Sequence, residues 1–454
     1  MTVYVCIRRN PGFCRTVHRK TAAGRQPADR WGDGTVKRNL LLLWIRDALT
    51  AGATALTSVS VLSAFFLHGG LSDEEIGFYL ALTPFVNFAV SLLFSGITGR
   101  VRKTVSACSV TGFLCAASAL GFLLFCRGDV PHGVFYTGAL AVGCLLSVFT
   151  ALKNIFDYKL PCEVMELTDY SLYVSVQGIV SGVSGIVCGA LLARLYAVLE
   201  FYPVTAGVFL CAGLFFTAAS VLNSRLRVLY PAGVGNGSAA EPSETSGNEK
   251  KPSGNRSAIR MLFTDRDFLL LIIPNFVRGF GAGAVSLVPV VAASVCAMGE
   301  SELALITVCT YIGTLVSCLL YAGMAKRFGA PLTGMIGGVG FCLLIPCFAG
   351  GNLLFFVLYT LAYVGYNIMC CAVPESVYHY VSAEKVSAFH TWRLALTTLG
   401  TTLSTAVFGK VLDRVPPFVL MAVGALSVVV CTAGYLLLYR GRAKLIGEPE
   451  KNGN

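Results

Sequence analysis

Only a few charged side chains interrupt the long apolar stretches of this sequence. Arg46 and Asp47 follow a Leu-Leu-Leu-Leu-Trp-Ile run, Arg278 follows Pro-Asn-Phe-Val, and Arg393 follows Trp392. A charge in an apolar setting is costly and usually functional. The planar donor fork of a guanidinium fits a carboxylate or phosphate through two parallel hydrogen bonds. These residues therefore predict a binding site for a polar or anionic solute.

The Arg46–Asp47 pair allows two other interpretations. Arg46 could extend to the membrane surface as a snorkelling side chain. Asp47 could carry a coupled proton, although Arg46 beside it stabilises its ionised form. Lys153 and Asp157 lie near the end of another apolar run, where we expect a helix end and, for Asp157, a part in gating.

Uncharged polar residues in the same apolar stretches are further candidates. Gln177, Asn275, Tyr366, Asn367 and the indole of Trp392 could contact a polar solute. Each of them could equally hydrogen-bond a neighbouring helix.

The composition indicates where such residues must lie. Of 454 residues, 55% are hydrophobic and 13% charged, and the mean hydropathy is +0.70. An average soluble domain carries about 25% charged residues, so the chain has too little charge to cover an ordinary soluble enzyme. It has no G-x-x-x-x-G-K-[ST] or H-E-x-x-H motif. Most of the 17 cysteines lie in apolar runs, where a cysteine behaves as a small hydrophobe. We expect no enzyme activity, cofactor or metal.

Twelve apolar runs are each long enough to cross a bilayer as a helix. They cover residues 40–66, 76–98, 104–126, 134–157, 172–197, 204–223, 268–291, 302–325, 330–349, 353–373, 387–411 and 417–439. A β-barrel would need short segments of alternating hydrophobicity instead. The predicted fold class is therefore an all-α polytopic membrane protein with twelve transmembrane helices.

The basic residues predict the orientation of these helices. With the N-terminus inside, 28 of the 35 Lys and Arg residues lie in cytoplasmic segments and 4 lie outside. Such a bias marks the cytoplasmic face. We expect a multi-pass protein of the plasma (inner) membrane with both termini cytoplasmic. The net charge of +11 is then explained without a nucleic-acid partner.

The polar segments divide the chain into parts. Residues 1–38 form a basic tail, expected to be disordered, and residues 224–266 are rich in Gly, Ser, Pro and mixed charge, as in a flexible linker. The predicted domains are the tail 1–38, a six-helix bundle over 39–223, the linker 224–266, a second six-helix bundle over 267–440 and a tail over 441–454.

The two halves share features in the same order, which indicates an internal duplication. The matched features are Arg46 and Arg278, the acidic turns 72–75 and 299–302, the basic turns 99–103 and 326–329, Pro161/Glu163 and Pro374/Glu375, and Ser171/Gln177 and Ser387/Arg393.

This arrangement resembles the major facilitator superfamily over about residues 38–440. The resemblance rests on six-plus-six topology, a central linker and basic turns after the second and eighth spans, where the family has G-x-x-x-D-R-x-G-R-K. Residues 99–103 keep Arg100, Arg102 and Lys103, and the second copy keeps Lys326 and Arg327 before Phe-Gly. The resemblance implies gating by these residues, alternating access around a central cavity, and a functional monomer in the lipid bilayer.

The sequence therefore predicts a secondary transporter of a small organic solute, leaning to a polar or anionic one, with a coupled proton as a second partner. The placement of Arg46 and Arg278 is similar to the organophosphate:phosphate antiporter branch, which implies two arginines facing one anion. The alternatives are proton-coupled efflux of hydrophobic compounds and a non-transporting membrane sensor on the same fold.

Overall fold

The computed structural model describes residues 33–94, 101, 103–165, 170–229, 266–378, 383–412 and 414–446. These residues form helices joined by short turns, and no strand occurs among them. The helices of the first half are α2 (Asp33–Leu56), α3 (Val59–His68), α4 (Asp73–Phe94), α5 (Thr104–Gly121) with η3 (Phe122–Phe125), α6 (His132–Val164), α7 (Tyr170–Val198) and α8 (Phe201–Ser224).

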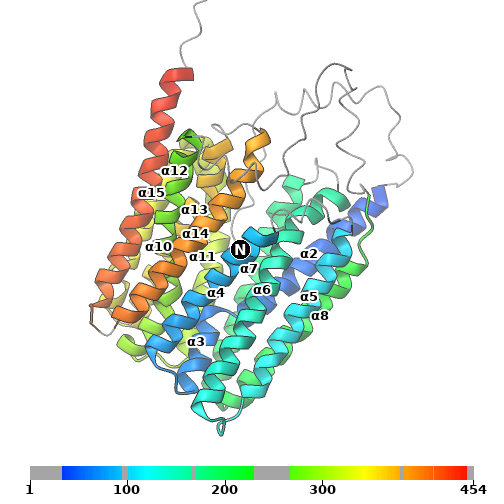
Figure 1. Cartoon of the computed structure of the whole chain (residues 1–454), viewed down its shortest axis with the longest axis vertical. Coiled ribbons are helices and arrows are strands. Elements are labelled where there is room, and N and C mark those ends of the chain that lie inside the picture. The colour runs from blue at the N-terminus through cyan, green and yellow to red at the C-terminus, as the bar shows by residue number, and fades with distance from the viewer. Residues whose placement is uncertain are drawn as a thin grey trace, which may run out of the picture.

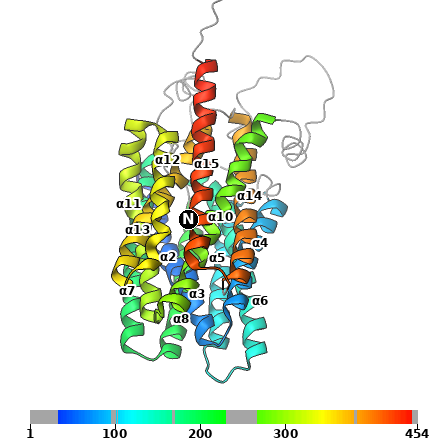
Figure 2. The same cartoon turned by 90° about the vertical axis from the view of Figure 1, so that its left-hand side faces the viewer.

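The second half repeats this plan. Its helices are α10 (Arg266–Cys296), α11 (Glu300–Phe328), α12 (Ala330–Phe341) with η4 (Cys342–Leu344) and η5 (Pro346–Ala349), α13 (Asn352–Tyr378), α14 (Ala383–Val411) and α15 (Pro417–Ile446). Each half folds into its own bundle (Figures 1 and 2). In the first, α2 packs on α7 and α8, and in the second, α10 packs on α14 and α15. The bundles meet most extensively where α4 packs on α14 and α7 packs on α11, and α3 also contacts α10 and α11.

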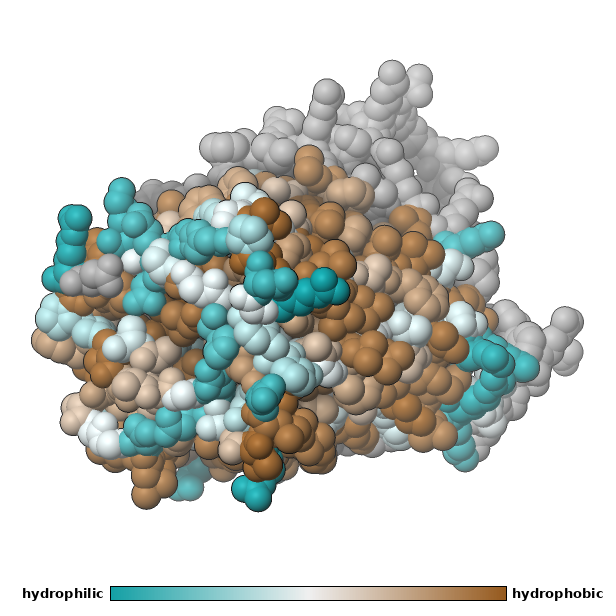
Figure 3. All heavy atoms as spheres, turned by 90° about the horizontal axis from the view of Figure 1, so that it is seen from below, coloured by the Kyte–Doolittle hydropathy of each residue, from teal (hydrophilic) through white to brown (hydrophobic). Residues whose placement is uncertain are grey.

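The surface of these bundles suits hydrocarbon. Large apolar side chains remain exposed along the helices, and Leu93, Leu124 and Leu353 are more than two-thirds exposed. Such an extensive apolar surface is unfavourable in water. Seen from one end, hydrophilic residues are scattered over the face and hydrophobic residues dominate the flank (Figure 3). The chain is thus built as a multi-pass membrane protein.

Among the described residues, eleven helical segments are long and apolar enough to cross a membrane. The twelfth, α14, is more polar because it carries a row of threonines. Thr397, Thr401 and Thr405 each donate a hydrogen bond to the carbonyl four residues earlier, at 2.7–2.9 Å. Since these hydroxyls are satisfied within their own helix, α14 can lie inside the bundle despite its composition.

The first span differs from the sequence prediction, which has one continuous helix over 40–66. The helix is interrupted between α2 and α3, and Ser58 has an extended backbone. The Thr57 hydroxyl donates to the Ala53 carbonyl at 2.9 Å, and the Ser58 hydroxyl lies 2.8 Å from that of Thr307 on α11. An interruption within a membrane is tolerated where protein groups surround it.

Two domain boundaries also differ from the prediction. The α2 helix begins at Asp33, so residues 33–38 are helical rather than part of a disordered tail, and α15 continues to Ile446, beyond 440. The side chain of Asn39 explains the early start, because its amide donates to the carbonyls of Val164 and Arg227, both at 2.8 Å. Residues 1–32 and 230–265, the greater part of the predicted tail and linker, lie outside the described residues.

The helix termini distinguish the two ends of the molecule. At one end, which we call the linker end, α8 ends and α10 begins; at the other, the far end, α3 ends and α4 begins (Figure 1). The bundles meet closely at the far end. A Cβ added to Gly77 of α4 would lie 2.9 Å from the Cα of Gly409 on α14. His68 Nδ1 lies 3.2 Å from Glu300 Oε1 across the same boundary.

Candidate functional site

Arg46 lies inside the N-terminal bundle rather than at a membrane surface, since it is 2% exposed. Its Nε donates to Asp47 Oδ1 at 2.8 Å, its Nη2 also contacts that carboxylate, and its Nη1 donates to Asp157 Oδ1 at 3.3 Å. Lys153 Nζ donates to the other oxygen of Asp157 at 2.5 Å. Two cations and two carboxylates thus balance one another. We call these four residues the N-terminal charge cluster.

Two uncharged residues complete this cluster. The hydroxyl of Tyr173 donates to Asp47 Oδ2 at 2.7 Å, and the Oδ1 of Asn223 accepts from Arg46 Nη1 at 3.4 Å. The cluster therefore joins four helices, α2, α6, α7 and α8. Removing one partner of a buried pair leaves an uncompensated charge, so the cluster holds the bundle together only while its charges balance.

Arg278 occupies the corresponding place in the C-terminal bundle, and it is 4% exposed. Its Nη2 donates to the Thr397 hydroxyl at 3.0 Å, and its Nη1 donates to the Cys370 sulfur at 3.4 Å. Its buried Nε has no hydrogen-bond partner among the described residues. Within that part of the chain, no carboxylate lies within 4.0 Å of this guanidinium. We call Arg278, Cys370 and Thr397 the Arg278 site.

The register of the internal repeat explains why the two arginines have different surroundings. Counting back four residues from Pro161 reaches Asp157, and counting back four from Pro374 reaches Cys370. Each of these residues contacts the arginine of its own bundle. The same count places Tyr366 where the first half has Lys153. The duplicated scaffold thus carries a charged cluster in one half and a neutral surrounding in the other.

The remaining predicted solute contacts separate into two groups. Asn275 is fully buried and donates to the Tyr435 hydroxyl at 2.6 Å, and Asn367 donates to the Thr314 hydroxyl at 3.3 Å. Both amides thus link helices. Arg393 is buried, whereas Tyr366, Trp392 and Gln177 are half-buried. Tyr366 interacts electrostatically with Arg278, so it belongs to the surroundings of the Arg278 site.

Three of the residues predicted to gate, Lys103, Lys326 and Arg327, are exposed at the linker end. The guanidinium of Arg327 lies 5.3 Å from the ring centre of Phe328. Arg100 and Arg102 lie outside the described residues. Asp157 is not at a helix end but belongs to the N-terminal charge cluster, so its partners are Arg46 and Lys153. Nothing in these positions tests the gating role, which stays a prediction.

Several partners were not foreseen from the sequence. Tyr173 and Asn223 belong to helices that are remote in the chain from Arg46, so no spacing rule points to them. Cys370 is not among the solute contacts that the sequence predicts. Counting back four residues from Pro374, as from Pro161 to Asp157, matches Cys370 with Asp157. The internal repeat therefore could have indicated Cys370 as a partner of Arg278, once Asp157 was known to contact Arg46.

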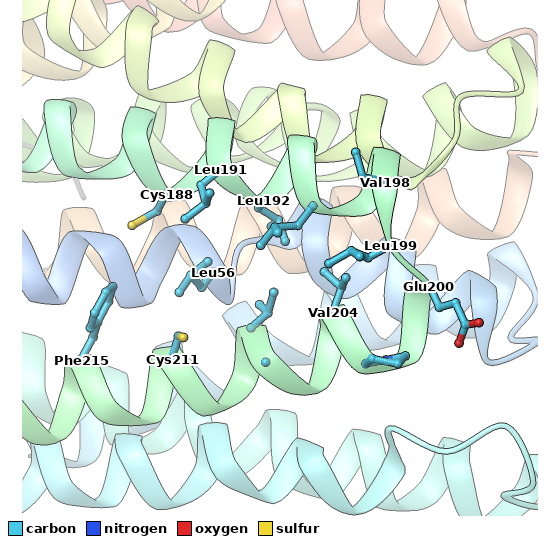
Figure 4. A pocket seen from close by; sticks show the side chains of 14 residues that line it. Leu56, Cys188, Leu191, Leu192, Val198, Leu199, Glu200, Val204, Cys211 and Phe215 are labelled. Atoms are coloured by element: carbon cyan, nitrogen blue, oxygen red, sulfur yellow. The ribbon is translucent and has the colours of Figure 1, made fainter.

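A groove of about 660 Å³ lies elsewhere, between α2, α7 and α8. Figure 4 shows its aliphatic lining, with Leu191, Leu192 and Val198 along α7 and the carboxylate of Glu200 at one end. Leu191 and Val198 are among the exposed hydrophobic residues, so this groove opens toward the lipid. It has no contact with either arginine and is not part of the candidate site.

Solved transporter structures resemble this chain in fold. A bacterial homologue of the human lysosomal transporter Spinster, inward-facing and unoccupied, matches with a TM-score of 0.64 at 13% identity, over 91% of this chain and 98% of its own. The xylose transporter XylE from E. coli, in a partially occluded inward-open conformation, has a TM-score of 0.60 at 12% identity, over 93% and 100%. The nucleoside transporter NupG has 0.55 at 14%, over 90% and 100%.

Sequence comparison adds no relative, because neither a protein-family profile nor a curated protein sequence matches the chain. The structural likeness nevertheless extends over both bundles and nearly the full length of each solved structure. Together with the twelve helical spans in two related halves, it identifies the architecture: the chain has the fold of the major facilitator superfamily.

Proposed function

We propose that this chain is a secondary transporter that moves small polar or anionic solutes across the membrane by alternating access. The observation that carries the anionic preference is Arg278, a buried cation whose surroundings among the described residues are neutral. The fold supports the transport class, since the similar solved structures are of transporters for a nucleoside and for xylose.

The arrangement of the bundles supports alternating access. Between the described residues, the bundles are joined toward the far end by the Ser58–Thr307 and His68–Glu300 contacts. Near the middle of the helices, the Tyr311 hydroxyl donates to the Ala51 carbonyl at 3.2 Å. If the linker end is cytoplasmic, as the basic residues predict, the far end is the outer side, and the bundles are in contact there. Rocking of the two bundles would then release the far end.

The solute is expected to meet Arg278 rather than Arg46. The donors of Arg46 are occupied by Asp47, Asp157 and their neighbours, and the N-terminal charge cluster is already neutral. Arg278 has only a hydroxyl and a thiol as partners. A buried guanidinium without a carboxylate partner favours one carboxylate or phosphate group. We therefore propose a site centred on Arg278 in place of the two-arginine site that the sequence predicts.

A thermal-shift screen with purified protein tests the substrate class, using sugars, sugar phosphates, carboxylates and cationic drugs at equal ionic strength. We expect phosphates or carboxylates to raise the melting temperature of the wild type and not that of Arg278→Gln. Arg414→Gln, a change at an exposed loop residue, serves as the matched control and should behave as wild type. Stabilisation by sugars or drugs alone would contradict the anionic preference.

Counterflow in proteoliposomes tests transport itself. A labelled form of the stabilising anion should accumulate transiently in vesicles preloaded with the unlabelled anion, and Arg278→Gln should abolish this exchange. A sensor on the same fold would bind the anion without exchanging it. Binding without exchange would therefore contradict the transport proposal while leaving the binding site intact.

A further inference from the structure

The two arginine sites differ at three matched positions. Aligning Arg46 with Arg278 places Gly279 where the first half has Asp47, and the proline register places Cys370 at Asp157. It also places Tyr366 at Lys153. Both carboxylates and the second cation of the N-terminal charge cluster are therefore replaced by neutral residues in the C-terminal bundle.

Only one of the two lost carboxylates could be restored within this packing. A Cβ at Gly279 would lie 2.5 Å from the Thr397 carbonyl oxygen and 2.7 Å from the Cα of Gly400. The backbones of α10 and α14 are thus in direct contact there, and no side chain fits. Cys370 is different, because its side chain already reaches the guanidinium of Arg278. Residue 370 therefore decides whether Arg278 is neutralised from within the protein.

Two donor groups of Arg278, Nη1 and Nε, have no strong acceptor among the described residues. The Thr397 hydroxyl accepts from Nη2 and donates its proton to the Arg393 carbonyl at 2.8 Å. Nη1 contacts a thiol, which is a weak acceptor. The buried Nε has no partner among the described residues. An oxyanion that displaced the thiol would accept from Nη1, the donor that Asp157 occupies on Arg46 in the other bundle.

We propose that Cys370 is the residue that sets charge selectivity, because its neutral thiol leaves Arg278 available for a single oxyanion of the solute, a carboxylate or a phosphate. This inference rests on the proposed function and specifies how its site selects. Cys370 is thus a specificity-determining residue that selects by charge rather than by size. It places no carboxylate on the arginine of its bundle, whereas Asp157 does so in the other bundle.

The test gives the Arg278 site the carboxylate that Asp157 provides at the matched position of the N-terminal charge cluster. Cys370→Asp should pair with Arg278, raise the melting temperature of the ligand-free protein, and weaken binding of the oxyanion at least tenfold. Cys370→Ser keeps a neutral side chain of similar size, so it should weaken binding less than Cys370→Asp does, which separates the effect of charge from that of packing. Inorganic phosphate and lactate serve as probes, and the two titrations distinguish phosphate from carboxylate recognition.

Each outcome bears on one proposal. If wild type binds an oxyanion, Arg278→Gln does not, and Cys370→Asp binds as wild type does, the inference about Cys370 is wrong while the proposed function stands. Equal losses in Cys370→Ser and Cys370→Asp would likewise overturn it, because packing rather than charge would then explain the effect. If wild type binds neither probe nor any other oxyanion, the anionic preference itself fails.

Discussion

Replacing Asp47 by asparagine removes one charge from the N-terminal charge cluster while keeping the shape of the side chain. In the structure, Asp47 receives hydrogen bonds from Arg46 and Tyr173 and is 5% exposed. Without the charge of Asp47, Asp157 is the one carboxylate of the N-terminal charge cluster beside the two cations Arg46 and Lys153. The buried cluster then carries a net positive charge. Removing one partner of a buried pair costs about 3–5 kcal/mol.

That free energy corresponds to a measurable fall in melting temperature. With an unfolding entropy of about 2.1 cal/mol/K per residue, Asp47→Asn should lower the Tm by roughly 3–12 °C. The smaller value applies if the whole chain unfolds together, and the larger one if the N-terminal bundle unfolds alone. Thermal unfolding of the purified protein in detergent, followed by a thiol-independent method such as intrinsic fluorescence, gives this number. Asp129→Asn, at an exposed loop residue, should shift the Tm by less than 1 °C.

A double variant separates charge balance from lost contacts. Arg46→Gln alone leaves one uncompensated negative charge, whereas Arg46→Gln with Asp47→Asn leaves only the balanced Lys153–Asp157 pair. We therefore expect the double variant to lie closer to wild type than either single variant. Losses that simply add in the double variant, or an unchanged Tm in Asp47→Asn, would refute the argument that charge balance stabilises this bundle.

The remaining predictions concern the contact between the bundles. His68→Ala removes a partly exposed ion pair with Glu300, and such a pair is worth about 0–1 kcal/mol. Opening of the far end should therefore increase by no more than about fivefold, as measured by thiol labelling of cysteines introduced at that end. A larger increase would mean that this pair is a main contact holding the far end closed. Gly185→Ala places a methyl group 2.4 Å from the Tyr311 ring and should shift the protein away from the conformation whose far end is closed, which increases thiol labelling. The nearest neighbour of a methyl group in Gly178→Ala is a sulfur at 3.6 Å, so this variant should label like wild type. Equal labelling of both glycine variants would contradict the observed packing of α7 on α11.

The fold could be predicted from the sequence because a bilayer constrains it strongly. Long apolar runs can cross hydrocarbon only as helices, so twelve spans were predicted from length and hydropathy. Eleven segments of the described residues are long and apolar enough to be such spans, and the solved structures confirm the fold. The interruption at Thr57–Ser58 was missed because both residues lie in an otherwise apolar run without proline. The early start of α2 was missed because it depends on Asn39 contacting two distant carbonyls.

The sequence by itself determined which charges interrupt the apolar stretches and which positions of the two halves correspond. Those features depend on composition and register, which are local properties of the chain. Only the tertiary structure decided that Arg46 meets Asp157, Tyr173 and Asn223, while Arg278 meets a thiol and a hydroxyl. The reason is physical: whether a buried guanidinium is neutralised depends on side chains from other helices, and their distances exist only after the bundle has packed.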